Sequence, residues 1–174
     1  MKRLSTLIAT VTLMLNLGVA ASYAQTLNLT ISGTAAPSTV DLGTGTGTSE
    51  YNLAANGGSF TFRTVSSPAP TAQPSNTCSG ATKLYIPIAA GMGVLRSPDG
   101  SLLQLKLTEG SDCIDFAAGH ALCIRIYEVI GGTGRFQNAS TPGDAVTLTM
   151  TVTPVVPGKF VFFFVTGEIT GRIS

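Results

Sequence analysis

The segment from Val146 to Thr153 alternates an apolar residue with a threonine at every position. A period of two residues is that of a β-strand, in which successive side chains point to opposite faces of the sheet. The apolar residues of this segment are therefore expected on one face and its threonines on the other. Leu103–Leu107 and Leu122–Ile126 alternate in the same way, so their leucines and isoleucines are also predicted to face the core.

Turn-forming residues separate these alternating runs. Ser97-Pro98-Asp99-Gly100 has the composition of a tight turn, and Pro154–Gly158 separates 146–153 from 159–166. Helical periodicity is nearly absent after Gln25. We expect about eight or nine strands with short connections, which predicts an all-β fold with a meandering antiparallel sheet, closed or sandwiched.

The first 24 residues have the layout of a secretory signal peptide. A basic start, Met1–Arg3, precedes a mostly apolar run from 4 to 21, and Ser22 and Ala24 are small residues at the −3 and −1 positions of a cleavage site before Gln25. We therefore predict cleavage after Ala24 and a secreted or periplasmic location. Residues 1–24 are excluded from the prediction of the fold.

The mature chain is close to neutral. Of ten basic residues, Lys2 and Arg3 are lost with the signal peptide, which leaves eight against nine acidic ones and a net charge of −1. Such a chain has no electrostatic footprint for nucleic acid or anionic lipid. No later run is long and apolar enough for a transmembrane helix. We expect no nucleic-acid partner and, after cleavage, no membrane partner.

The start of the mature chain differs in composition from the rest. Residues 43–48 read GTGTGT, a flexible sequence with little to bury, although 27–32 is compatible with a strand. Residues 25–57 are therefore predicted to be a flexible arm or a loosely attached extra strand. The β-barrel domain is expected over 58–174.

The run from Phe160 to Val165 is apolar on both faces, whereas one face of an antiparallel strand usually meets water. Either residues 25–57 or a loop cover the second face, or Phe160, Phe162 and Phe164 form a subunit interface or a ligand groove. The second alternative would make the protein a homo-oligomer or a carrier of an apolar molecule.

The three cysteines predict a disulfide, because an exported chain meets an oxidising environment. Cys113 and Cys123 flank a segment that resembles a hairpin end, so we expect them to be bonded and Cys78 to be left over. A bond from Cys78 to either of the others remains open. One histidine and no Cys-x-x-Cys pair predict neither a metal site nor a cofactor.

Candidate catalytic residues are few. His120 is the only imidazole, and Asp112 and Asp115 lie close to it in sequence. A nucleophilic triad also needs a positioned serine or cysteine, and no suitable motif is present, so an exposed turn histidine is expected. Glu128 and Glu168 are predicted to point outward from strands. These observations favour a protein that is not an enzyme.

Glycines crowd the segment before the threonine-rich strand. Gly131, Gly132 and Gly134 resemble a phosphate loop, but no helix follows them and there is no P-loop lysine. We interpret them as a structural corner that permits positive φ and a sharp change of direction. Phe136 is expected to fold back onto the end of the core, and Arg135 to cap carbonyls or pair with a carboxylate.

The GGTGRF hexapeptide, followed by Ala139-Ser140 and a Thr-rich strand, resembles the signature of dirigent-like proteins and of bacterial exported allene oxide cyclase-like barrels. The segments CIDF, ALCIRIYEV and GEITGRIS are similar to that bacterial group, and the likeness covers roughly residues 84–174. It implies an eight-stranded antiparallel barrel with an apolar interior. Asn138 and Thr141 stand where the family usually has glycine. The motif is architectural in that family, so no catalytic residue carries over.

Two functions follow from these observations. The first is a non-enzymatic exported barrel that binds an apolar small molecule or assembles with itself. The alternative, carried by the resemblance, is a small-molecule cyclase or a stereochemistry-guiding protein that acts in the barrel cavity. A polar group facing the cavity favours the alternative, and a dry, filled core favours the first.

Overall fold

The computed structural model describes residues 25–139, 145–157 and 159–173. The predicted signal peptide and its cleavage site lie outside these residues, as does Thr141. Eight strands make up most of the described chain: β1 (Gln25–Ser38), β2 (Thr48–Ala55), β3 (Phe60–Pro68), β4 (Lys83–Arg96), β5 (Leu102–Asp115), β6 (His120–Gly132), β7 (Ala145–Val156) and β8 (Lys159–Ile173).

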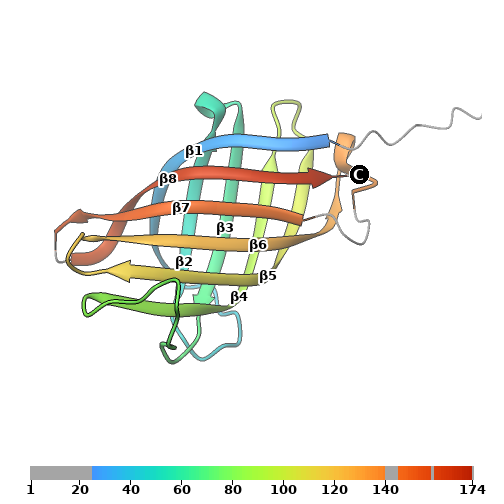
Figure 1. Cartoon of the computed structure of the whole chain (residues 1–174). Helices are drawn as coiled ribbons and strands as arrows, with labels where there is room; N and C mark the ends of the chain where they lie inside the picture. The colour runs from blue at the N-terminus through green and yellow to red at the C-terminus, as the bar shows by residue number, and fades with distance from the viewer. Residues whose placement is uncertain (1–24, 140–144, 158, 174) are drawn as a thin grey trace, which may run out of the picture.

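Each strand is antiparallel to the next, and β1 pairs with β8, so the sheet closes into a barrel (Figure 1). The prediction of an all-β, eight-stranded antiparallel barrel is confirmed. Closure leaves no unpaired edge strand, so the backbone donors and acceptors of every strand find partners on both sides. Within the described part of the chain, no helix is long and apolar enough to cross a membrane.

The alternation in β7 places its side chains as expected. Val146, Leu148, Met150 and Val152 point into the barrel and are buried, while Thr149 on the other face is exposed. These residues belong to a core to which every strand contributes inward-facing side chains, with leucine and valine the most frequent among them. The packed interior fills one end and the middle of the barrel.

Residues 25–57 are an integral part of the barrel, so the prediction of a flexible arm and of a domain beginning at residue 58 is wrong. β1 pairs with β8 over eleven positions, from Gln25 opposite Ile173 to Ala35 opposite Phe163. Leu27 and Leu29 are buried in the core. The segment alternates like the later strands, and closure of the sheet supplies hydrogen-bond partners on both of its sides.

The GTGTGT segment is also tied down, by its threonines. The hydroxyl groups of Thr44 and Thr46 lie 2.5 and 2.7 Å from that of Ser67, and Thr46 donates to the Pro68 carbonyl at 2.7 Å. Gly43 and Gly45 have φ near +72° and +71°, which turns both hydroxyl groups toward β3. A disordered loop was expected here, but side-chain hydrogen bonds hold it.

Strand β6 is inverted relative to the prediction. Cys123, Arg125 and Tyr127 point into the barrel, whereas Leu122 and Ile124 point outward and are 54% and 45% exposed. The alternation was read correctly as a strand, but the face expected to meet the core meets water instead.

A β-bulge in β5 sets which side chains face inward near the open end. Leu107 lies opposite Tyr127 and Glu109 lies opposite Ile126, so Thr108 is an extra residue without a counterpart on β6. Before the bulge the odd-numbered residues of β5 face the core, and after it the even-numbered ones do. The bulge therefore turns Asp112 into the barrel, opposite Cys123.

The same change of parity determines the disulfide. Cys113 bonds to Cys78, in the connection between β3 and β4, so the predicted Cys113–Cys123 pair is wrong and the option of a bond from Cys78 is correct. Cys113 lies opposite Leu122 on the outer face, whereas Cys123 points inward and is a free, buried thiol. Two cysteines on opposite faces of a sheet cannot reach bonding distance.

Candidate functional site

A cavity of about 810 Å³ opens at the end of the barrel that carries the β5–β6 and β7–β8 turns. Figure 1 shows these two turns at the same end of the molecule. The wall is mostly apolar, and polar side chains lie among the lining residues. The apolar lining residues include Ala35, Phe116, Val152, Pro154, Pro157 and Phe163. The polar ones include Tyr51, Asp112, His120 and Cys123.

An ion pair lies beneath this cavity. Arg125 Nη2 is 2.7 Å from Asp112 Oδ1, and the arginine side chain is 1% exposed. Arg125 Nη1 donates to the carbonyls of Ser111 and Ile124, each at 2.9 Å. The guanidinium is thus held by β5 and by its own strand, and it presents the Asp112 carboxylate to the cavity.

Gly110 makes room for this arginine. A Cβ at Gly110 would lie 2.9 Å from Arg125 Cδ, closer than carbon atoms approach without displacement. Gly110 and Arg125 are opposite each other in the β5–β6 ladder. The buried charge therefore depends on a missing side chain across the strand pair.

The pair is ionised and neutral overall. Burial by itself lowers the pKa of Arg125, whereas the negative charge of Asp112 beside it raises that pKa, and the net effect leaves it above its ordinary value. A guanidinium that keeps its proton neutralises the carboxylate beside it. The floor of the cavity is consequently polar without carrying a net charge.

Tyr51 and Cys123 keep their protons at the same floor. Burial raises the pKa of Tyr51 and of the Cys123 thiol well above their ordinary values, and the Asp112 carboxylate raises both further. The floor therefore offers a hydroxyl, a thiol and a carboxylate, which can donate and accept hydrogen bonds.

A second polar pair separates the cavity from the packed core. The hydroxyl groups of Tyr127 and Thr64 are 2.8 Å apart, and Thr64 donates to the Met92 carbonyl at 2.8 Å. The Tyr127 ring meets Phe62 edge-on, with centroids 5.9 Å apart. Burial raises the pKa of Tyr127, so it stays neutral and donates to Thr64.

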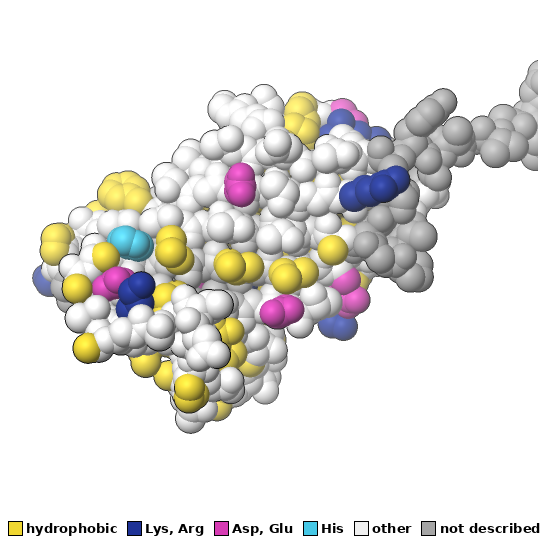
Figure 2. Space-filling view, viewed as in Figure 1, with side chains coloured by type: hydrophobic (Ala, Val, Ile, Leu, Met, Phe, Trp, Pro, Cys, Tyr) yellow, Lys and Arg dark blue, Asp and Glu magenta, His cyan; other side chains and the backbone are white. Residues whose placement is uncertain are grey.

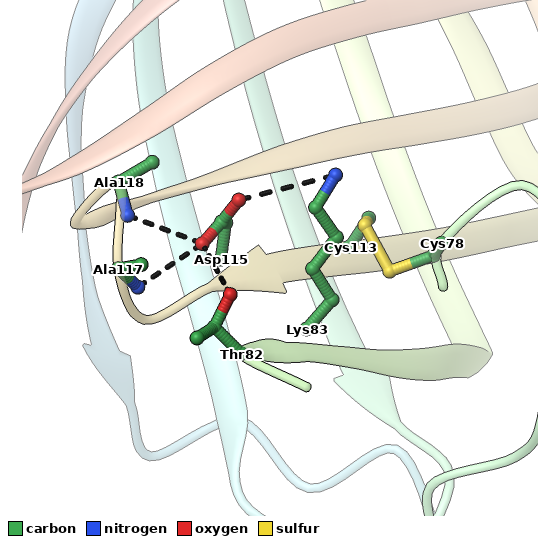
Figure 3. A network of polar contacts seen from close by, with 7 residues as sticks. All are labelled: Cys78, Thr82, Lys83, Cys113, Asp115, Ala117 and Ala118. Carbon is green, nitrogen blue, oxygen red and sulfur yellow. Dashed lines mark hydrogen bonds and ion pairs between the residues drawn. A yellow bond between two sulfur atoms is a disulfide. The ribbon is translucent and has the colours of Figure 1, made fainter. Parts of the chain in front are cut away.

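The mouth of the cavity is held by Asp115, at the β5–β6 turn. Its Oδ1 accepts from the backbone amides of Ala117 and Ala118 at 3.0 and 3.1 Å and from Thr82 at 3.2 Å (Figure 3). These contacts lower the pKa of Asp115, and the hydrogen bond from the Ala118 amide contributes most. Lys83 lies 3.9 Å from its Oδ2.

The disulfide is next to this network. Figure 3 shows Cys113 on the same strand as Asp115, with Cys78 reaching it from the β3–β4 connection. Together they attach that connection to the wall of the open end. The rim on this side is thus covalently fixed.

His120 lines the cavity mouth, at the start of β6. Its backbone pairs with that of Asp115 in the β5–β6 ladder, but among the described residues no side-chain hydrogen bond or ion pair joins it to Asp112 or Asp115. Glu128 points outward and pairs with Lys106 at 3.2 Å, and Glu168 is exposed. His120, Glu128 and Glu168 are therefore not part of the polar floor of the cavity.

The predicted corner lies between β6 and β7, away from the cavity lining. Phe136 is 1% exposed and closes the core there, and Arg135 stacks on the rings of Phe60 and Phe136, at 5.5 and 4.7 Å. Gly134 has φ near +56°, and a Cβ at Gly132 would lie 2.3 Å from the Phe136 carbonyl oxygen. The stacking was not among the roles expected of Arg135.

The phenylalanine run of β8 divides between two faces. Phe163 packs against the core and lines the cavity, whereas Phe162 and Phe164 point outward and are exposed. The side chain of Phe160 lies outside the described part of the structure. Residues 25–57 do not cover the outward face, because β1 lies beside β8 in the sheet.

The polar floor of the cavity was not predicted from the sequence. Arg125 and Cys123 were assigned to the outer face of β6, and Tyr51 was placed in a flexible arm. One sequence feature could have indicated it: Cys123, Arg125 and Tyr127 share one face of a strand that is otherwise apolar. The bulge at Thr108, which directs Asp112 to meet that trio, leaves no mark in the alternation.

The fold and the site define a small antiparallel β-barrel with an open, mostly apolar cavity above a buried ion pair. Within 25–139, 145–157 and 159–173, no cluster of three or more histidine, cysteine or acidic side chains is arranged to hold a metal ion. No protein-family model, curated protein or solved structure matches the chain.

Proposed function

We propose that this chain is an exported protein that binds a largely apolar small molecule in the open end of the barrel. The open cavity of about 810 Å³ is the observation that carries the proposal. Its volume is in the range of small-molecule sites, and its wall combines apolar contacts with a few polar groups. The packed remainder of the barrel gives the site a rigid base.

The floor determines the kind of polar group that the ligand bears. Because Arg125 is neutralised by Asp112, the floor attracts no anion. Tyr51 and Cys123 donate hydrogen bonds, and the free lone pairs of Asp112 accept them. A neutral ligand with a hydroxyl or carbonyl group at one end satisfies these atoms and leaves its apolar body against Val152 and Phe163.

Binding of a neutral fluorescent probe tests this proposal. N-phenyl-1-naphthylamine is expected to gain fluorescence in the wild-type protein and to be displaced by long-chain alcohols before the matching carboxylates. Ala121→Phe fills the cavity from its lining and is expected to abolish the signal. Thr149→Phe, on the exposed face of β7, is the matched control and retains it. Equal signals from both variants would place the probe outside the cavity.

A second function is favoured by one specific observation. Asp112, Tyr51 and Cys123 are polar groups that face the cavity, which is the arrangement expected of a cyclase or a stereochemistry-guiding protein. The likeness of GGTGRF to the dirigent-like and allene oxide cyclase-like barrels supports the same interpretation. Recovery of the bound ligand separates the two functions: a carrier releases the ligand unchanged, whereas a cyclase or stereochemistry-guiding protein releases a converted product.

Export is part of the proposal. The Cys78–Cys113 disulfide is compatible with a secreted or periplasmic protein. The mass of the protein recovered from its natural compartment tests this point. It is expected to begin at Gln25 and to lack two hydrogens relative to the reduced chain.

A further inference from the structure

The tip of the β7–β8 hairpin is exposed on both of its faces. Val161 and Phe162 are neighbours in β8, so their side chains point to opposite sides, yet they are 52% and 60% exposed. Val155 and Val156 of β7 are likewise exposed. We call these four residues the apolar hairpin. Because neither side is covered, this part of the sheet extends past the packed body of the barrel.

The apolar hairpin stands at the mouth of the cavity. Pro154 and Pro157, which frame its β7 half, both line the cavity. Phe116, on the β5–β6 turn at the same end, is also exposed and also lines it. Hydrophobic side chains gather at this end of the space-filling view (Figure 2). Exposed apolar groups of the hairpin and of the β5–β6 turn thus stand at the opening, beside the polar His120 and Asp115.

The charges at this end suit a lipid surface. The sequence from 154 to 164 contains no acidic residue, and its one basic residue, Lys159, is exposed. Asp115, the acidic side chain at the β5–β6 turn, already accepts hydrogen bonds from two backbone amides and Thr82 and lies 3.9 Å from Lys83. A lysine beside exposed aromatic and aliphatic groups can reach phosphate headgroups while its neighbours enter the acyl region.

We propose that the apolar hairpin inserts into a lipid surface and docks the open end of the barrel on a membrane. A second copy of the chain would cover one face of the hairpin and leave the other in water. A fluid lipid layer surrounds both faces, which is what Val161 and Phe162 require. The expectation of no membrane partner rested on net charge and on the absence of a long apolar helix, and neither concerns a short apolar tip.

Docking in this position also gives the cavity a route to its ligand. The mouth lies between the apolar hairpin and Phe116, so an apolar molecule can pass from the lipid to the cavity without crossing water. This consequence rests on the proposed function, whereas the docking itself does not. A cavity that binds nothing would leave the membrane contact in place.

The chain contains no tryptophan, so one introduced indole reports on its own surroundings. Phe162→Trp places it on the hairpin, and Leu122→Trp places it at an equally exposed site on the barrel wall. With phosphatidylcholine vesicles, the emission of Phe162→Trp is expected to shift to the blue and to be quenched by brominated acyl chains. Leu122→Trp is expected to show neither effect.

Sedimentation with the same vesicles measures affinity. Val156→Ser combined with Phe162→Ser is expected to weaken binding by about tenfold or more, since each removes apolar area from the contact. Leu122→Ser combined with Ile124→Ser is the control, because those side chains are exposed on the wall, and it is expected to bind as wild type. All four substituted positions are exposed, so the fold should tolerate them.

Three results would overturn the proposal. The first is wild-type protein that stays in the supernatant with vesicles of phosphatidylcholine alone and with added phosphatidylglycerol. The second is an equal loss of binding in the hairpin and wall variants. The third is a wild-type dimer in the absence of lipid that the hairpin variant converts to a monomer, which would make the partner a second copy.

Discussion

Arg125 and Asp112 meet inside the barrel from neighbouring strands, with Arg125 Nη2 2.7 Å from Asp112 Oδ1. They are not opposite each other in the ladder: Asp112 faces Cys123, and Arg125 faces Gly110. The contact is therefore diagonal, and it exists because the arginine bends across the space that the glycine leaves. A charge pair buried in this way is costly to break from one side.

Removal of one partner is predicted to destabilise the barrel strongly. Asp112→Ala leaves the buried guanidinium without its counter-charge, and about 3–5 kcal/mol of unfolding free energy should be lost. Arg125→Met combined with Asp112→Leu removes both charges and should retain more stability than the single variant. Urea denaturation measures both. A single variant as stable as wild type would show that the pair is solvated.

The glycine corner between β6 and β7 should tolerate no branched side chain. Gly134→Val forces a β-branched residue to φ near +56°, and Gly132→Val places a Cβ 2.3 Å from the Phe136 carbonyl oxygen. Each is expected to cost about 2 kcal/mol or more. Gly47→Ala is the control, because a Cβ there meets nothing within 4 Å. If both valine variants melt at the wild-type temperature, this account of the corner is wrong.

The disulfide should depend on Cys78 and be indifferent to Cys123. The bond spans 35 residues, for which the chain-entropy model gives a stabilisation of about 4 kcal/mol. Cys78→Ser is expected to lose much of that and to free Cys113. Cys123→Ala should retain the bond, and its intact mass should still lack two hydrogens. A fully reduced mass for Cys123→Ala would restore the Cys113–Cys123 pairing.

Stability in acid should depend on Asp99. Hydrogen bonds from Ser97 and Ser101 hold the pKa of Asp99 at about 2. Because this is below the value of an unfolded aspartate, about 3.9, its contribution is present above pH 4 and is lost as pH falls toward 2. Asp99→Asn should flatten the melting temperature over that interval, and thermal melts from pH 2 to 5 would show it. A parallel fall in wild type and variant would assign the effect to other carboxyls.

Alternation by itself determined the strands, and in β7 it also determined the buried face. Over residues 146–153 every apolar residue of β7 stands on one side and every threonine on the other, so only one orientation buries the apolar set. The signals for Leu103 and Leu105 in β5 were equally clear. The short turns between these runs predicted an antiparallel meander of about eight or nine strands, closed or sandwiched, and the resemblance implied the eight-stranded barrel.

Tertiary structure alone decided which way β6 faces and what the barrel holds at its open end. Both faces of β6 contain large side chains, so the alternation defines the two faces but does not indicate which of them is buried. The bulge at Thr108 turns Asp112 inward, and Gly110 leaves space for Arg125, so the buried face of β6 is the one that meets a carboxylate. These are contacts between residues on different strands, and no local pattern in either strand contains them.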